Sequence, residues 1–205
     1  MKIVCLDMEG VIAPEIWIEL AERTGIEALR RTTRDEPDYD KLMRYRLDIL
    51  DGNGLGIAAL QPIIDEIEPL PGALAFLDAL RAKYQVVILS DTFYEFVGPL
   101  MAKMRYPTLF CHRLTVAAGK LTGYRLRMAD HKKAAVEAFR ALNFTVCAAG
   151  DSYNDTRMLG AADAGFLFRP PRNVADEFPQ FPVFTEYDAL FDRIAETDPH
   201  PISVG

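Results

Sequence analysis

Four short apolar runs along the chain have the length and composition of buried strands. They lie at residues 3–6, 85–89, 144–149 and 164–168. Segments 72–84 and 132–143, which precede the second and third runs, carry apolar residues at helical spacing. Strands that alternate with helices of this length are typical of a sheet covered on both faces. The pattern therefore predicts a doubly wound, Rossmann-like α/β core with a mostly parallel sheet.

The interval between the first two predicted strands is too long for a single crossover helix. Residues 14–25 and 38–50, within this interval, also show helical spacing, whereas connections in α/β units are usually short. We therefore predict that residues 13–70 form a small helical cap, and that residues 1–12 and 71–205 form the core. Alternating apolar and polar residues at 112–126, around a turn near Ala118 and Gly119, predict a β-hairpin.

Composition and charge argue against several classes of partner. The 205 residues are half apolar and carry a net charge of −7, without a basic tract, so we expect no nucleic-acid partner. The longest apolar stretches are strand-sized, shorter than the ~20 residues of a membrane helix, so we expect no membrane partner. The cysteines form no CxxC pair and the N-terminus does not resemble a signal peptide, which predicts a cytoplasmic location.

Polar side chains follow three of the predicted strands, at the edge where open α/β sheets bind ligands. Asp7 and Glu9 follow the first strand, Ser90 follows the second, and Asp151 and Asp155 follow the third. A single Asp after a strand is more often the N-cap of the next helix. Four carboxylates at one edge, however, repel each other unless a hard cation neutralises them. Ligation by oxygen alone favours Mg²⁺.

Two lysines that could bind a phosphate group lie at the start of the predicted helix before the Asp151 strand. Either Lys132 or Lys133 can point toward the same edge, and we prefer Lys132 from its position on the helix. Two such lysines are, by themselves, more often solvated surface residues. With one of them at this edge, the chain has every group that phosphoryl transfer needs: an Asp nucleophile, a hydroxyl, a metal cluster and a cation for the phosphate.

In this order, the motifs resemble those of the haloacid dehalogenase superfamily of phosphohydrolases. The matching residues are D-M-E-G-V (7–11), V-I-L-S (87–90), Lys132 and G-D-S-Y-N-D (150–155). The chain is most similar to the phosphoserine phosphatase branch, whose helical cap also lies between the first two motifs. Around residues 89–93 it resembles members that also transfer phosphate from phosphoserine to homoserine.

Two departures from the wider family are visible. Glu9 stands where most members have a second aspartate, which keeps the carboxyl group. Asp91 and Thr92 replace two glycines of ordinary phosphoserine phosphatases, which leaves open which molecule accepts the phosphate. We expect Asp91 and Thr92 to help position an alcohol acceptor.

The resemblance implies a Mg²⁺-dependent phosphoserine phosphatase, with homoserine as a second phosphate acceptor. Asp7 would be the nucleophile that forms an aspartyl-phosphate, and Glu9 the general acid and base. The ion would be held by Asp7, the backbone carbonyl of Glu9, and Asp151. Asp155 would either bind the ion or orient its ligands from outside.

The resemblance also implies two groups of substrate-binding residues. The phosphoryl group would be bound by Ser90, Lys132 and Asn154, with Asp91 beside them. In the cap, Arg46 would clamp the substrate carboxylate, Glu15 would accept its ammonium, and Tyr39 would complete the pocket. The alternative is that these three are exposed helix charges and a packing residue. No role is expected for the histidines, which are His112, His131 and His200.

Two other functions stay open. One is a phosphatase of the same fold that acts on another small phosphomonoester. The other is a signalling receiver domain that accepts phosphate on an aspartate, although such a domain explains neither Glu9 nor the inserted cap. Dehalogenation needs no metal cluster of this kind, and no G-x-G-x-x-G follows the first strand to bind a nicotinamide. The oligomeric state is not predicted.

Overall fold

A single sheet of seven strands organises the computed structural model, which describes residues 1–32, 35–36 and 38–197. The strand order is β4-β3-β2-β1-β5-β6-β7. The strands are β1 (Lys2–Leu6), β2 (Gln85–Phe93), β3 (Thr108–Ala117), β4 (Lys120–Arg125), β5 (Thr145–Gly150), β6 (Ala164–Phe168) and β7 (Val183–Phe184). All neighbours pair in parallel except β3 and β4, which form an antiparallel hairpin. The predicted fold class and hairpin are confirmed.

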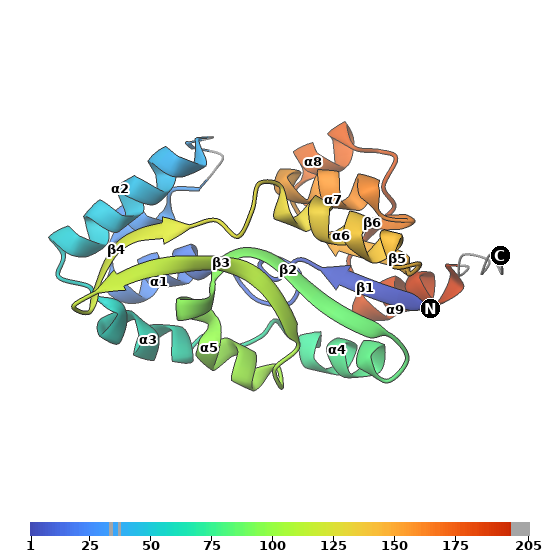
Figure 1. Ribbon diagram of the computed structural model, residues 1–205, viewed down its shortest axis with the longest axis horizontal. Coiled ribbons are helices and arrows are strands. Elements are labelled where there is room, and N and C mark those ends of the chain that lie inside the picture. Colours follow the sequence, from blue (N-terminus) through green and yellow to red (C-terminus); the bar gives the residue numbers. More distant parts are fainter. Residues whose placement is uncertain (33–34, 37, 198–205) are drawn as a thin grey trace.

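Helices cover both faces of this sheet and extend beyond the carboxyl end of β1 (Figure 1). The α-helices are α1 (Ile16–Thr24), α2 (Tyr39–Gly52), α3 (Ile57–Asp65), α4 (Ala73–Arg81), α5 (Tyr94–Lys103), α6 (His131–Ala141), α7 (Thr156–Ala161), α8 (Arg172–Glu177) and α9 (Tyr187–Glu196). In the described part of the chain, two short 3₁₀ helices, η1 (Glu27–Arg30) and η2 (Tyr153–Asp155), lie in the connections.

The central strand β1 sends alternate side chains into two apolar cores, as the period of a strand requires. Val4 and Leu6 belong to the core that includes side chains of α4, α5 and α9. Ile3 and Cys5 belong to the second core, beneath α6 and α7. Because both faces are buried, β1 reads in the sequence as a continuous apolar run, and its carboxyl end is fixed between β2 and β5.

Strand β2 continues four residues beyond the predicted end at residue 89. Its pairing with β3 shifts register between Leu89 and Phe93, so that Phe93 lies opposite His112. Such an irregularity bends a strand and redirects its side chains. The sequence gives no sign of it, because Asp91 and Thr92 interrupt the apolar run that marks the buried part of the strand.

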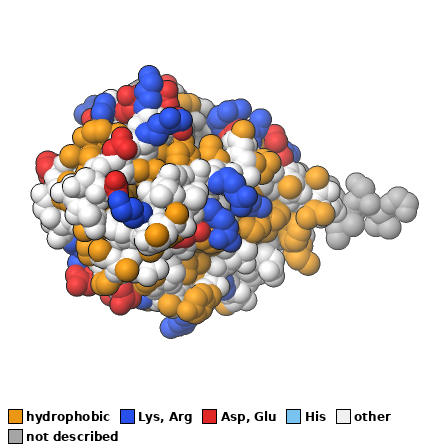
Figure 2. Space-filling model, turned by 60° about the vertical axis from the view of Figure 1, so that its left-hand side comes forward, with side chains coloured by type: hydrophobic (Ala, Val, Ile, Leu, Met, Phe, Trp, Pro, Cys, Tyr) orange, Lys and Arg blue, Asp and Glu red, His pale blue; other side chains and the backbone are white. Residues whose placement is uncertain are grey.

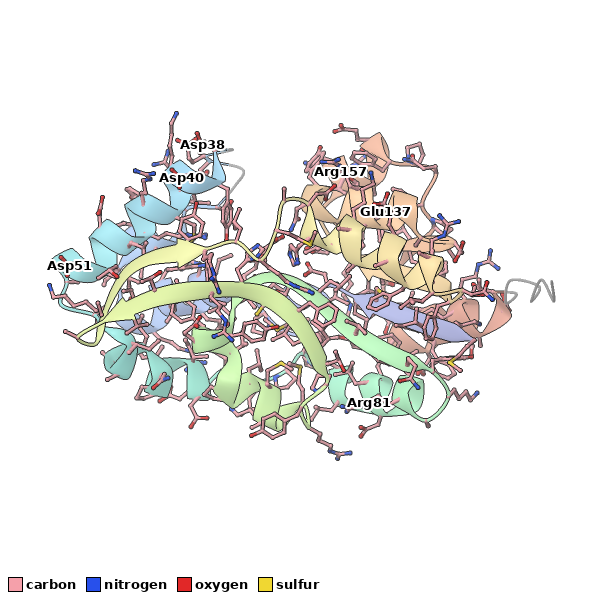
Figure 3. All side chains as sticks on the ribbon, viewed as in Figure 1. Asp38, Asp40, Asp51, Arg81, Glu137 and Arg157 are labelled. Atoms are coloured by element: carbon pink, nitrogen blue, oxygen red, sulfur yellow. The ribbon has the colours of Figure 1, made fainter. Side chains whose placement is uncertain are left out.

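The helices between β1 and β2 are contacted by the hairpin. The backbone N–H of Ile57, at the start of α3, donates to the carbonyl of Gly119 in the hairpin turn (2.9 Å). The Lys120 ammonium pairs with Asp51 (2.6 Å), and the Tyr124 hydroxyl donates to Asp40 (2.7 Å). Figure 3 shows Asp40 and Asp51 on α2, beside the hairpin. The division into a core and a cap at residues 13 and 70 stays a prediction.

The surface carries charges of both signs. Acidic and basic side chains are interspersed with hydrophobic ones on the face shown in Figure 2. Within the described residues, no helix is both long enough and apolar enough to span a bilayer.

Candidate active site

Asp7 lies directly beyond the end of β1 and is held there by its neighbours. Its backbone N–H donates to the carbonyl of Ala149 on β5 (2.9 Å), which continues the strand pairing by one residue. Its Oδ1 accepts hydrogen bonds from the Met8 N–H (2.8 Å) and the Lys132 ammonium (2.9 Å). The loop then turns at Gly10, whose φ of +77° suits glycine. A Cβ there would lie 2.5 Å from the Asp151 carboxyl, so a larger residue would displace it.

Asp151 and Asp155 reach the same edge from the end of β5. Asp155 Oδ2 accepts hydrogen bonds from the backbone N–H groups of Asp151 and Ser152 (3.1 Å each) and so closes the loop. Its Oδ1 accepts from the Lys132 ammonium (2.8 Å). A Cβ on Gly150 would lie 2.4 Å from the Asp155 side chain. The glycine therefore lets Asp155 fold back against the strand.

The lysine at this edge is Lys132. It lies in the first turn of α6 with only 3% of its surface exposed, and its Nζ bridges Asp7 and Asp155. Lys133, one residue on, points elsewhere and pairs with Glu137 (3.3 Å). The structure thus brings Lys132, the lysine preferred from its position on the helix, into the carboxylate cluster.

Burial and mutual repulsion dominate the electrostatics of the cluster. Burial, reinforced by Asp155, raises the pKa of Asp7 well above its ordinary value and that of Asp151 to about 7. Burial by itself would lower the pKa of Lys132, but Asp155, Asp7 and Asp91 outweigh it and hold that pKa well above its usual value. Several carboxylates therefore share one lysine, and the cluster holds more negative charge than Lys132 compensates.

This surplus of negative charge suits a divalent cation. Carboxylate oxygens of Asp7, Asp151 and Asp155 lie within 4.8 Å of one another. Oxygen donors of this kind are the ligands of hard cations such as Mg²⁺. A bound cation would also return Asp7 and Asp151 to the ionised form that their burial disfavours. The donor set fits the predicted metal.

Glu9 lies at the entrance to the helices that follow β1. Its Oε1 accepts the backbone N–H of Ile16 at the start of α1 (2.9 Å). Burial, and then the neighbouring Glu15, raise the pKa of Glu9 to about 8. At neutral pH the carboxyl is therefore mostly protonated, which is the form a general acid needs.

The end of β2 brings Asp91, which directly follows Ser90, to the cluster. Ser90 is fully buried, and its Oγ accepts the Thr92 N–H (3.3 Å). Asp91 Oδ2 accepts from Asn154 Nδ2 (2.7 Å) and lies 3.3 Å from Lys132 Nζ. The strand ends of β1, β2 and β5 thus meet at one site, as expected for parallel strands.

Of the three residues predicted in the cap, Arg46 is the most buried, with 6% of its surface exposed. Its guanidinium lies over the Trp17 ring (4.4 Å to the centroid) and donates to the carbonyl of Arg31 (2.8 Å). Its Nε has no hydrogen-bond partner among the described residues. Burial lowers the pKa of Arg46 to about 10, against the attraction of Glu9. A buried, charged side chain with a spare donor can receive a ligand carboxylate.

The other two residues predicted in the cap differ from Arg46. Glu15 is exposed at the N-terminus of α1 and is close enough to raise the pKa values of Glu9 and Asp151. Tyr39 begins α2, and its hydroxyl donates to the backbone carbonyl of Asp91 (3.2 Å). Tyr39 therefore connects the helices after β1 to the end of β2.

Two residues at the site were assigned no role from the sequence. His112 on β3 and His131 at the start of α6 both contact Asp91, at 3.3 and 3.1 Å. Because His131 directly precedes Lys132, the sequence could have indicated that His131 lies near the site. Nothing in the sequence places His112 there, because its position depends on the register shift in β2. His200 lies outside the described residues.

Comparisons with known proteins agree with the geometry. The family described as haloacid dehalogenase-like hydrolase matches residues 1–163. A phosphoserine phosphatase of Pseudomonas syringae pv. tomato is 57% identical over 93% of this chain and 81% of its own length. The phosphoserine phosphatase ThrH of Pseudomonas aeruginosa is 56% identical over 93% of each chain. The predicted resemblance is confirmed.

The fold also matches a solved structure of lower sequence identity. A substrate-bound phosphoserine phosphatase superposes with a TM-score of 0.77, at 20% identity, over 94% of this chain and 97% of that one. The similarity of fold therefore extends over the sheet, the helices that cover it and the helices between β1 and β2.

Proposed function

Because the chain belongs to the haloacid dehalogenase-like hydrolases, we propose that it is a Mg²⁺-dependent phosphoserine phosphatase that works through an aspartyl-phosphate on Asp7. The observation that carries the proposal is the Lys132 ammonium, which bridges Asp7 and Asp155 at the sheet edge that also holds Asp151. The substrate is proposed from the two relatives of more than 55% identity that are named phosphoserine phosphatases.

The first half of the reaction uses Asp7 and Glu9. A carboxylate oxygen of Asp7 bonds to phosphorus while the bond from phosphorus to the serine oxygen breaks. That oxygen takes a proton from Glu9, whose pKa of about 8 keeps the proton available. In the second half, Glu9 takes a proton from the incoming water or alcohol, whose oxygen bonds to phosphorus and releases Asp7.

The remaining residues neutralise and orient the phosphoryl group. Asp7, Asp151 and the carbonyl of Glu9 would hold Mg²⁺, which when bound supplies positive charge to the phosphoryl oxygens. Asp155 acts from outside the set of metal ligands and orients the groups around them, because its oxygens already accept hydrogen bonds from Lys132 and the loop backbone. Lys132, Ser90 and Asn154 would donate to the phosphoryl oxygens.

Arg46 is proposed to bind the substrate carboxylate, and Glu15 its ammonium. We expect Arg46→Ala to raise the KM for phosphoserine by an amount equivalent to about 2–5 kcal/mol of binding, because a buried charge-assisted pair is lost. Hydrolysis of p-nitrophenyl phosphate, which has no carboxylate, should change little. Steady-state kinetics with both substrates measure this difference.

The matched control is Arg44→Ala. Arg44 lies on the same helix but is exposed and pairs with Asp40 (2.7 Å), so its loss should affect neither substrate. Equal losses on both substrates for Arg46→Ala would make Arg46 a structural residue of the cap.

Transfer to homoserine is proposed as a second activity. Serine and homoserine share their ammonium and carboxylate, so one set of cap residues can hold both. Their difference of one methylene is discriminated only weakly, by roughly 1–3 kcal/mol. We expect phosphoserine plus homoserine to give phosphohomoserine at the expense of inorganic phosphate, as quantified by ³¹P NMR. If homoserine leaves the phosphate yield unchanged and no phosphohomoserine forms, the enzyme is a phosphatase only.

A panel of small phosphomonoesters tests the alternative substrate. Turnover of another ester well above that of phosphoserine would replace phosphoserine in the proposal and leave the aspartyl-phosphate chemistry intact. The predicted cytoplasmic location and the absence of nucleic-acid and membrane partners stay predictions.

A further inference from the structure

The carboxylate of Asp91 is surrounded by four donors from three other elements. Its Oδ1 faces His131 Nε2 (3.1 Å) and His112 Nε2 (3.3 Å). Its Oδ2 accepts from Asn154 Nδ2 (2.7 Å) and lies 3.3 Å from Lys132 Nζ. Both histidine side chains are buried, with 3–4% of their surface exposed, whereas a third of the Asp91 side chain is accessible. Asp91 thus joins two buried rings to two residues that face the reaction site.

The hydrogen bonds of His112 define which of its nitrogens carries the proton. Its Nδ1 accepts the backbone N–H of Arg127 (3.2 Å), so the proton of the neutral ring is on Nε2. That proton is donated to Asp91. Asp91, His112 and His131 have ligand atoms close enough for a metal, but a metal would need the lone pair of Nε2. The geometry therefore indicates a hydrogen-bonded cluster and not a second cation site.

The charge of Asp91 excludes direct binding of phosphate by its side chain. An ionised carboxylate only accepts hydrogen bonds, and phosphoryl oxygens also only accept them. The side chain of Asp91 can therefore act on the phosphoryl group only through the groups that it contacts, Lys132 and Asn154.

We propose that Asp91 is a positioning residue for Lys132 and Asn154, and that His112 and His131 fix Asp91 for this purpose. The roles of Lys132 and Asn154 as phosphate ligands rest on the proposed function. A lysine has four rotatable bonds, and ordering it at the moment of binding costs entropy. The cluster orders Nζ before phosphate arrives, which is the usual benefit of preorganisation.

The decisive comparison is between His131→Leu and His131→Gln. Glutamine places an amide N–H close to where the imidazole Nε2 lies, so it keeps the donor to Asp91, whereas leucine removes it. The readout is the Kd of inorganic phosphate, measured calorimetrically in the presence of Mg²⁺. We expect His131→Leu to weaken binding roughly tenfold, as losing an outer partner does, and His131→Gln to stay within about twofold of wild type.

A double-mutant cycle separates positioning from packing. If His131 acts through Asp91, the variant Asp91→Ala/His131→Leu should bind phosphate no more weakly than Asp91→Ala. Thermal unfolding checks that each variant folds. Should His131→Leu fail to fold, Asp91→Asn carries the test, because its amide N–H₂ faces the donors of Lys132 and Asn154 and should also weaken binding.

Three results would overturn the inference: unchanged phosphate binding in Asp91→Asn, equal weakening by leucine and glutamine at position 131, or additive losses in the cycle. Phosphate binding is measured without turnover. A protein that binds phosphate as described but does not hydrolyse phosphoserine would therefore refute the proposed function and leave this inference standing.

Discussion

Asp7→Asn is expected to reduce phosphoserine turnover by roughly 10⁴-fold or more, the scale on which loss of a covalent nucleophile acts. The amide has nearly the shape of the carboxylate but cannot bond to phosphorus in the same way. Turnover is measured by phosphate release, and the phosphoenzyme by intact-mass spectrometry of the quenched reaction. The wild type should gain the mass of one phosphoryl group and the variant should not.

The same substitution should leave the fold intact. The pKa of Asp7 is raised by burial and by Asp155, so folding disfavours its ionised form. A neutral amide removes that penalty, although it also weakens the contact with Lys132. We therefore expect a thermal unfolding midpoint close to that of the wild type. Turnover by the folded variant above a trace level would eliminate the covalent mechanism.

Glu9→Gln is the second change with a large expected effect. Turnover of phosphoserine should fall by roughly 10²–10⁴-fold, the usual contribution of general acid–base catalysis. The glutamine carbonyl can still accept the Ile16 N–H that Glu9 Oε1 accepts (2.9 Å), so the loop geometry should persist. Stopped-flow measurements of each half of the reaction show where the loss occurs.

A substrate with a good leaving group supplies the control for Glu9. The p-nitrophenolate ion departs without a proton, so formation of the phosphoenzyme from p-nitrophenyl phosphate should be less affected than from phosphoserine. Its hydrolysis by water should still be slow, because that step needs the base. Equal phosphoserine rates in the wild type and Glu9→Gln would remove Glu9 from the mechanism.

The sequence predicted the residues at the strand ends because parallel topology imposes their meeting. Apolar runs located β1, β2 and β5, and the carboxyl ends of such strands share one edge. Asp7, Ser90 and Asp151 were therefore found without knowledge of any contact between them. The choice of Lys132 over Lys133 followed from the direction of neighbouring residues on a helix, which differ by about 100°.

The surroundings of Asp91 could not be predicted in this way. His112 lies 21 residues after Asp91 in the sequence and reaches it because β2 and β3 shift their pairing between Leu89 and Phe93. A register shift leaves the apolar pattern of either strand almost unchanged. The contact of the hairpin turn with α3 is equally invisible, since it joins a backbone carbonyl to a backbone N–H.

That hairpin contact has a consequence for protein engineering. Gly56 lies against Gly119, and a Cβ on Gly56 would lie 2.4 Å from the carbonyl oxygen of Gly119. A chimera that received residues 13–70 from a relative would therefore meet a hairpin turn fitted to a different helix. The exchange would also remove Asp40 and Asp51 of the native segment. Tyr124 and Lys120 of the hairpin would then lose these two partners. Residues 108–125 have to be exchanged together with the helices that they contact.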